Sequence, residues 1–293
     1  MELKPHLVFP RWSNTATLVV LLVLAALPVY AAVLIGYGLD PVTLDEKYQP
    51  VQPVPYSHAV HVGGRPGEKE PLGLDCRYCH NTVEKADFAA LPPTETCMNC
   101  HRALYPKSDK LAMVRDSFGS GEGLSGVKAG QPIRWRMVTT VSDYVYFNHA
   151  AHVNSGVSCV ECHGPVNHMD VVYQAKPMNM AWCLQCHRDP TDRLRPRDMV
   201  TKLDWAPSAE DPSTVAVFAS LPDQELWERV HGVGLEKGEA TRNLMKTKKE
   251  LAQEYVQKVT ETESTQALKK ELGAILKERY HVNPSTDCVT CHR

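Results

Sequence analysis

The chain has 293 residues, enough for about two domains of ordinary size. Its 32 Lys and Arg residues nearly balance 34 Asp and Glu residues, so the charge gives no reason to expect a nucleic acid as partner. All ten cysteines fall into Cys-x-x-Cys pairs, and each pair is followed directly by His. A disulfide framework has no use for those histidines, which excludes the disulfide-rich class.

The first predicted element is a transmembrane helix over residues 16–37. This run carries no charge and, at about 1.5 Å per residue, is long enough for a hydrocarbon core about 30 Å thick. Lys4 and Arg11 precede it, which places residues 1–15 in the cytoplasm. The alternative is a cleaved signal peptide, since a small residue, Ala31, stands at a possible cleavage position. Both interpretations put the rest of the chain outside the cytoplasm.

A proline-rich linker, residues 38–57, follows and is expected to be an extended spacer. Two copies of one pattern come next, at 58–118 and 144–200. Each copy has an aromatic residue, His-x-x-His-Val and then two Cys-x-x-Cys-His motifs. Between them, residues 119–143 contain a Gly-x-Gly-x-x-Gly string with no apolar strand before it, so we expect a flexible connection rather than a dinucleotide site.

Residues 201–280 form a linker and a helical segment, because apolar residues recur there at helical spacing and cysteine is absent. The last motif occupies residues 281–293. The predicted fold class is a multihaem cytochrome c built mainly from short α-helices and loops wrapped on haems. It has two class III (c7-like) repeat modules, one N-terminal transmembrane helix and a helical C-terminal segment.

Cys-x-x-Cys-His is the attachment motif of c-type haem, in which both thiols bind the porphyrin covalently and the His binds iron. Structural zinc would want four thiolates or a Cys/His mixture, which five separated pairs do not suit. The sequence therefore predicts five covalent haems. The haem-binding cysteines are Cys76, Cys79, Cys97, Cys100, Cys159, Cys162, Cys183, Cys186, Cys288 and Cys291. The proximal ligands are His80, His101, His163, His187 and His292.

The second iron ligands decide whether a haem is closed or open to a substrate. The repeated His-x-x-His elements supply four predicted distal ligands, His58, His61, His149 and His152. For the fifth iron two candidates stand first. His281 precedes Cys288 by the same seven residues that separate His152 from Cys159, and Met169 lies near the third and fourth motifs. His168, Met178 and Met180 lie in the same region.

Three strings carry a family resemblance: residues 97–101 (Cys-Met-Asn-Cys-His), residues 144–152 (Tyr-Val-Tyr-Phe-Asn-His-Ala-Ala-His) and residues 180–183 (Met-Ala-Trp-Cys). With the His-x-x-His pairs, they make the chain resemble the pentahaem cytochrome c subunit of alternative complex III. That complex is a bacterial membrane-bound quinol:electron acceptor oxidoreductase. The resemblance is close over residues 56–190 and extends to the last motif. In the family, Met stands at the places of Met169 and Met180, while a His matching His281 is not fixed.

The resemblance implies an electron relay rather than a catalytic subunit, in the bacterial inner membrane with its haems in the periplasm. Electrons would come from an iron-sulfur subunit related to molybdopterin enzymes, after a multi-helix membrane subunit has oxidised quinol. They would pass to a monohaem cytochrome c or a terminal oxidase. Two alternatives are a stand-alone membrane-anchored multihaem quinol dehydrogenase and a multihaem reductase, which would need one five-coordinate haem.

Overall fold

The computed structural model describes residues 10, 12–38, 46–65, 72–231 and 247–292. The chain divides into two compact units, Met1–Glu46 and Lys47–Arg293, and each is described by itself. The cytoplasmic segment predicted for residues 1–15 lies mostly outside the described residues.

The first unit contains one long helix, α1 (Trp12–Gly38), with 27 residues and Pro28 inside it. It carries no charged residue and buries none of its side chains within the protein. It begins before the predicted residue 16 because its first turn is polar, and the Ser13 hydroxyl donates a hydrogen bond to the Pro10 carbonyl. Helix α1 is long and apolar enough to cross a membrane, a property shared by membrane anchors and signal sequences.

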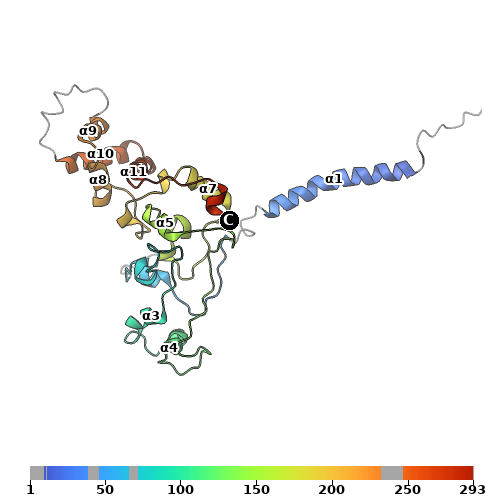
Figure 1. The fold of residues 1–293 in the computed structure, drawn as a ribbon, viewed down its shortest axis with the longest axis horizontal. Coiled ribbons are helices and arrows are strands. Elements are labelled where there is room, and N and C mark those ends of the chain that lie inside the picture. Colours follow the sequence, from blue (N-terminus) through green and yellow to red (C-terminus); the bar gives the residue numbers. More distant parts are fainter. Residues whose placement is uncertain (1–9, 11, 39–45, 66–71, 232–246, 293) are drawn as a thin grey trace, which may run out of the picture. The chain divides into compact units, whose positions relative to one another are not determined.

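The second unit is made of short helices and loops, as the sequence predicts (Figure 1). Within the described part of this unit, β pairing is limited to isolated bridges at Val145–His292 and Val157–Leu194. The helices before residue 170 are η1 (Ala59–Gly63), α2 (Cys76–Cys79), α3 (Thr94–His101), η2 (Asp109–Leu111), α4 (Ala112–Phe118), α5 (His149–Asn154), α6 (Cys159–His163) and η3 (Val166–His168). The later ones are α7 (Met180–Arg188), η4 (Thr191–Arg193), η5 (Arg197–Met199), α8 (Pro212–Ala219), α9 (Asp223–His231), α10 (Lys248–Thr262), α11 (Thr265–Arg279) and α12 (Cys288–Cys291).

The largest apolar core lies among α8, α9, α10 and α11, which gather in the orange and red part of the chain (Figure 1). Leu226, Val256, Leu272 and Leu276 are fully or almost fully buried there. Helix α10 begins with a capping box in which Thr247 and Glu250 satisfy each other's backbone N–H groups. The predicted helical character of the C-terminal segment is confirmed.

The region of the first two motifs has a smaller core, where Val54, Met98, Val114 and Ile133 pack between α3 and α4. Part of the proline-rich segment belongs to this unit. Its Lys47 N–H donates to the Gln174 carbonyl, and the Gln174 N–H donates to the Tyr48 carbonyl. Those backbone bonds hold residues 47–48 against Gln174, more than a hundred residues away in sequence.

The glycine-rich connection is organised around one carboxylate. Asp116, at the end of α4, accepts hydrogen bonds from the backbone N–H groups of Gly123 and Ser125, both at 2.8 Å. The side-chain hydrogen bond with Ser125 and then these two backbone bonds lower the pKa of Asp116. A Cβ atom at position 121 would lie 1.9 Å from the Asp116 carboxylate, so glycine is required there by close approach rather than by a bound phosphate. The loop is therefore a turn held together by hydrogen bonds to the Asp116 carboxylate.

Candidate haem sites

The five motifs, numbered sites 1 to 5 in chain order, each lie on a short helix. Sites 1 to 5 are on α2, α3, α6, α7 and α12. One helical turn puts residues three apart on the same face, so both thiols of a pair point to one side and the following His lies beside them. All ten cysteines are free thiols, and most are partly buried. Such pairs are available for covalent attachment rather than consumed in disulfides.

Four of the five motif histidines are held by one ring nitrogen. The Nδ1 atoms of His80, His101 and His187 contact the carbonyl oxygens of Ala90, Leu104 and Ser285 at 2.9, 3.0 and 2.7 Å. His292 makes a longer contact of 3.4 Å with the Tyr144 carbonyl. Because a carbonyl only accepts, each Nδ1 carries the proton and Nε2 keeps its lone pair. This is the tautomer that binds a metal through Nε2.

Three of the four histidines of the His-x-x-His elements follow the same rule. His61, His149 and His152 donate from Nδ1 to the carbonyls of Ser57, Asp87 and Asn148, at 2.7, 2.8 and 2.7 Å. The Nδ1 atom of His58 is buried and has no hydrogen-bond partner among the described residues.

His168 differs from these histidines in using both ring nitrogens. Its Nδ1 donates to the Gly64 carbonyl at 2.8 Å, and its Nε2 contacts the Asp204 carboxylate at 2.9 Å. With both nitrogens engaged, the ring offers no lone pair to a metal. The structure therefore gives His168 a structural contact rather than a ligand's environment.

Rings from the two kinds of element lie close together in pairs. With metal–nitrogen bonds of about 2.0–2.1 Å, and about 1.1 Å from ring nitrogen to ring centre, two imidazoles on opposite sides of one metal have centres about 6.3 Å apart. The ring centres of His61 and His101 are 6.3 Å apart, as are those of His149 and His163, and those of His152 and His187 are 6.1 Å apart. The residues present therefore fit iron held from both faces at sites 2, 3 and 4.

At site 1, His58 lies near enough to His80 for the charge of one ring to affect the other. Burial lowers the pKa of His58 to about 4, and the neighbouring rings of His80, His61 and His163 lower it further. Burial, with His149 and His80, lowers the pKa of His163 to about 4. Burial likewise lowers the pKa of His152. These imidazoles are neutral at neutral pH, and only a neutral imidazole binds iron.

One aromatic ring packs against both histidines of each His-x-x-His element. The ring of Tyr56 meets His58 edge-on at 4.8 Å and stacks on His61 at 4.5 Å. Phe147 repeats both contacts with His149 and His152, at 4.8 and 4.6 Å. The sequence shows the repeated aromatic residue but not its role, which is to fix the orientation of both rings.

Site 5 has a proximal histidine whose neighbour is Tyr144, at 5.5 Å between ring centres. Met169 is buried, and its carbonyl accepts from the Ala59 N–H at η1, close to sites 1 and 3. His281 is exposed at the end of α11, and Met180 is 65% exposed at the start of α7. None of the contacts of the described residues joins Met169 or His281 to His292, and the fifth distal ligand stays a prediction.

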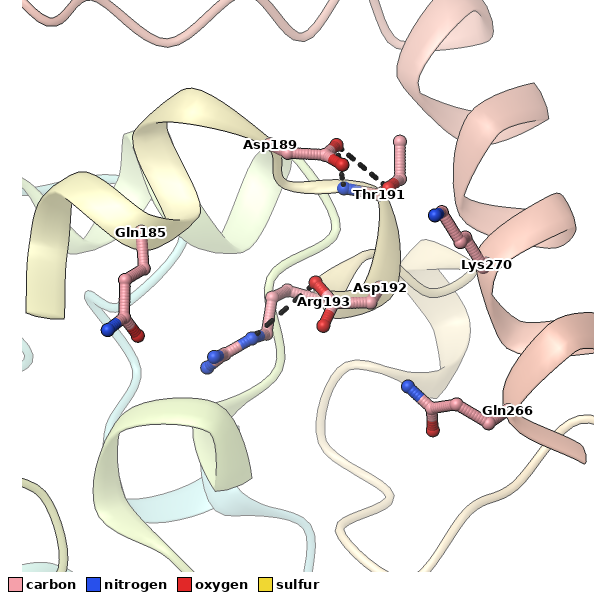
Figure 2. Close-up of a pocket in the computed structure, with 7 residues that line it drawn as sticks. All are labelled: Gln185, Asp189, Thr191, Asp192, Arg193, Gln266 and Lys270. Atoms are coloured by element: carbon pink, nitrogen blue, oxygen red, sulfur yellow. Dashed lines mark hydrogen bonds and ion pairs between the residues drawn. The ribbon is translucent and has the colours of Figure 1, made fainter.

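A separate polar pocket of about 420 Å³ lies between the end of α7, η4 and α11. Figure 2 shows Asp189 bonded to Thr191 and Asp192 beside Arg193, with Gln266 and Lys270 facing them from α11. Its walls carry none of the cysteine or histidine ligands. They are also more polar than the walls of most cofactor pockets, so we assign it no haem.

Comparison with known proteins agrees with these features. Residues 145–204 match the family described as cytochrome c7 and related cytochrome c. The chain is also 29% identical over 161 residues to the multihaem cytochrome c subunit of menaquinone reductase from Nitratidesulfovibrio vulgaris. That match covers 47% of this chain and 69% of the relative. Residues 145–204 thus form a c7-like cytochrome domain within a multihaem c-type cytochrome.

Proposed function

We propose that this chain is the haem-carrying electron-transfer subunit of a membrane complex that exchanges electrons with menaquinone. The proposal is supported by the paired imidazoles at sites 2, 3 and 4, together with the likeness to a menaquinone reductase subunit. When bound, each haem supplies an iron that accepts and releases one electron. The chain then provides spacing, ligands and exclusion of water.

In this proposal every site is held by its own residues. The ten thiols form thioethers to five haems, and the five motif histidines are proximal ligands. His58, His61, His149 and His152 close sites 1, 2, 3 and 4, and either Met169 or His281 closes site 5. The haem modules keep their predicted bounds of 58–118 and 144–200. Helix α1, if retained, anchors the chain in the bacterial inner membrane with the haem unit in the periplasm.

Closure of the iron by two ligands favours electron transfer over catalysis. A substrate needs an open position on the metal, and two imidazoles that bind one iron from opposite faces would leave none. This weighs against the multihaem reductase. Assignment of the quinone chemistry to a partner subunit rests on the relative, which is named as one subunit of menaquinone reductase.

The direction of electron flow has a second candidate. The strings at residues 97–101, 144–152 and 180–183 favour a quinol-oxidising complex like alternative complex III. The chain would then pass electrons from an iron-sulfur subunit to a periplasmic cytochrome c or a terminal oxidase. The named relative favours flow toward menaquinone.

The test compares the purified holoprotein with the complex purified through a tag on this chain. Menaquinol should leave the haems of the isolated chain oxidised and reduce those of the complex. Rapid reduction of the isolated chain would identify a stand-alone quinol dehydrogenase instead. Adding menaquinone to the reduced complex, and separately an oxidised monohaem cytochrome c, then determines the direction by which acceptor reoxidises the haems. A high-spin haem that binds nitrite would overturn the proposal in favour of a reductase.

A further inference from the structure

We infer that the five haem sites lie in space in the order 2–1–3–4–5, so that the two repeats meet through their first motifs and sites 2 and 5 are the two ends. The inference rests on the proposed function only in that every motif carries a haem. Order along the sequence would instead place site 2 beside site 3. Four sets of contacts carry the inference, one for each neighbouring pair.

Sites 1 and 2 touch through their own motifs. The Asn99 side-chain amide, inside motif 2, donates to the Tyr78 hydroxyl, inside motif 1, at 3.2 Å. Their distal histidines, His58 and His61, are three residues apart and share the Tyr56 ring. Site 2 is therefore a direct neighbour of site 1.

Sites 1 and 3 are joined by one turn of chain at residues 200–201. The Cys76 thiol of site 1 contacts the Thr201 carbonyl at 3.8 Å, while Ser158, next to Cys159 of site 3, donates to the Val200 carbonyl at 2.6 Å. The sulfur atoms of Cys76 and Cys159 lie close to each other. The first motifs of the two repeats thus lie side by side.

Sites 1 and 3 also contact each other near the distal histidine of site 3. Both the backbone N–H and the Nδ1 of His149, the distal candidate of site 3, reach the Asp87 carbonyl, which follows motif 1. The Asn154 amide donates to the Glu84 carbonyl at 2.9 Å. Val83 and Val153 are buried together in a small apolar cluster against Cys159. Site 2 has no comparable set of contacts with site 3 among the described residues.

Sites 3 and 4 repeat the arrangement of sites 1 and 2. His149 and His152 lie on one short helix, α5, and share the Phe147 ring. The ring of His149 lies 6.3 Å from that of His163 at site 3, and the ring of His152 lies 6.1 Å from that of His187 at site 4, measured between ring centres.

Site 5 joins the row at site 4. The His187 Nδ1 donates to the Ser285 carbonyl, three residues before Cys288, at 2.7 Å. After burial, the Cys291 thiol is the neighbour that raises the pKa of Cys183. Motif 5 also contacts Tyr146, whose N–H donates to the Cys291 carbonyl at 2.9 Å.

An independent observation agrees with this order. Of the ten cysteines, two are exposed, Cys100 and Cys288, and they belong to site 2 and site 5. The sites at the ends of the row are therefore the ones that solvent, and hence a redox partner, can reach most easily. Sites 1, 3 and 4 occupy the interior.

The direct test is the position of the irons in crystals of the holoprotein, from anomalous scattering at the iron absorption edge. Five peaks should form a row in which the iron bound by His80 has two neighbours, those bound by His101 and His163. A row in which the His101 iron lies between the other two would overturn the inference. Loss of electron exchange with menaquinone would leave this order intact, so failure of the proposed function is distinguishable.

A solution test uses two matched ligand variants. A Met ligand raises the potential of its haem, which then stays reduced and changes the charge felt by its immediate neighbours. His61→Met at site 2 should therefore shift the potential of one other haem, and His152→Met at site 4 should shift two. Potentials are followed by NMR through the haem methyl signals. Two shifted neighbours in His61→Met would contradict the order.

Failure of Met to bind iron would appear as a high-spin haem. In that case the double variant Cys97→Ser/Cys100→Ser, which removes the haem of site 2, replaces His61→Met. This variant should likewise shift the potential of one other haem. Haem content and mass of each variant confirm that the other four haems remain.

Discussion

A histidine can bind iron when one ring nitrogen donates a hydrogen bond and the other keeps a free lone pair. The chain contains histidines of this kind and one histidine with a partner at both nitrogens. His152 donates from Nδ1 to a backbone carbonyl and faces His187, whereas His168 has a partner at each nitrogen. Sequence alone treats the two as equal histidines near the second pair of motifs. The difference depends on Gly64 and Asp204, which are 104 and 36 residues away from His168.

His152→Ala should convert one haem to a high-spin form that binds carbon monoxide, because one iron loses its distal ligand. The matched variant His168→Ala should leave all haems low-spin. Optical and electron paramagnetic resonance spectra of the two holoproteins measure this directly. A high-spin haem in His168→Ala, or none in His152→Ala, would mean that the ligands are assigned wrongly.

The His168–Asp204 contact also predicts a pH dependence. The Gly64 carbonyl, and then the Asp204 carboxylate, raise the pKa of His168 above its ordinary value of 6.5. The contact therefore stabilises the folded protein fully below pH 6.5, where His168 is charged in both the folded and the unfolded state. This stabilisation is lost as the pH rises through the raised pKa that His168 has in the folded protein. His168→Gln should lower the urea midpoint of the holoprotein more at about pH 5.5 than at about pH 8.5. Asp204→Asn should show the same dependence, and an equal loss at both pH values would contradict the contact.

At the scale of elements, motif helices and the C-terminal helices were predictable for different reasons. Covalent attachment needs contiguous residues, so five haem motifs can be read directly from the sequence. Apolar spacing likewise reveals the amphipathic helices α10 and α11. The spacing of apolar residues does not show which element a helix face packs against, such as the packing of α11 on η4. It also does not show that the Asp116 carboxylate lies inside the glycine-rich loop.

Gly273 shows how closely those two elements approach. A Cβ atom at position 273 would lie 1.5 Å from the Thr191 carbonyl oxygen, which is backbone and cannot rotate away. Gly273→Ala should therefore lower the free energy of unfolding by about 1–3 kcal/mol, despite the better helix propensity of Ala. Glu278→Ala on an exposed face of α11 is the control, with an expected change within about 0.5 kcal/mol. Denaturant titration of both variants measures the difference, and equal stability would show that η4 and α11 do not pack here.

For the whole molecule, the distribution of apolar core separates a part that depends on haem from a part that does not. The cluster around α8, α9, α10 and α11 contains 14 buried apolar residues. The clusters near the first three motifs contain four and three. The spatial order of the sites could not be predicted from the sequence. It depends on contacts such as Asn99–Tyr78 and Cys76–Thr201, which the spacing of residues along the chain does not indicate.

Protein produced without haem attachment should lose structure unevenly. Residues 47–200 should exchange their amide hydrogens rapidly, since haem would supply most of their core, while residues 212–231 and 248–279 should remain protected by their own packing. Hydrogen–deuterium exchange with mass spectrometry compares the two forms. Uniform protection of residues 47–200 in the haem-free protein would show that haem is not their core.

Covalent haem at every motif is the central claim, and intact-mass spectrometry after acid denaturation and solvent extraction tests it most directly. The account predicts that the colour stays with the protein and that the chain weighs more than its amino acids by five haems. A chain with the mass of its amino acids alone, or with a haem missing from any motif, would contradict it.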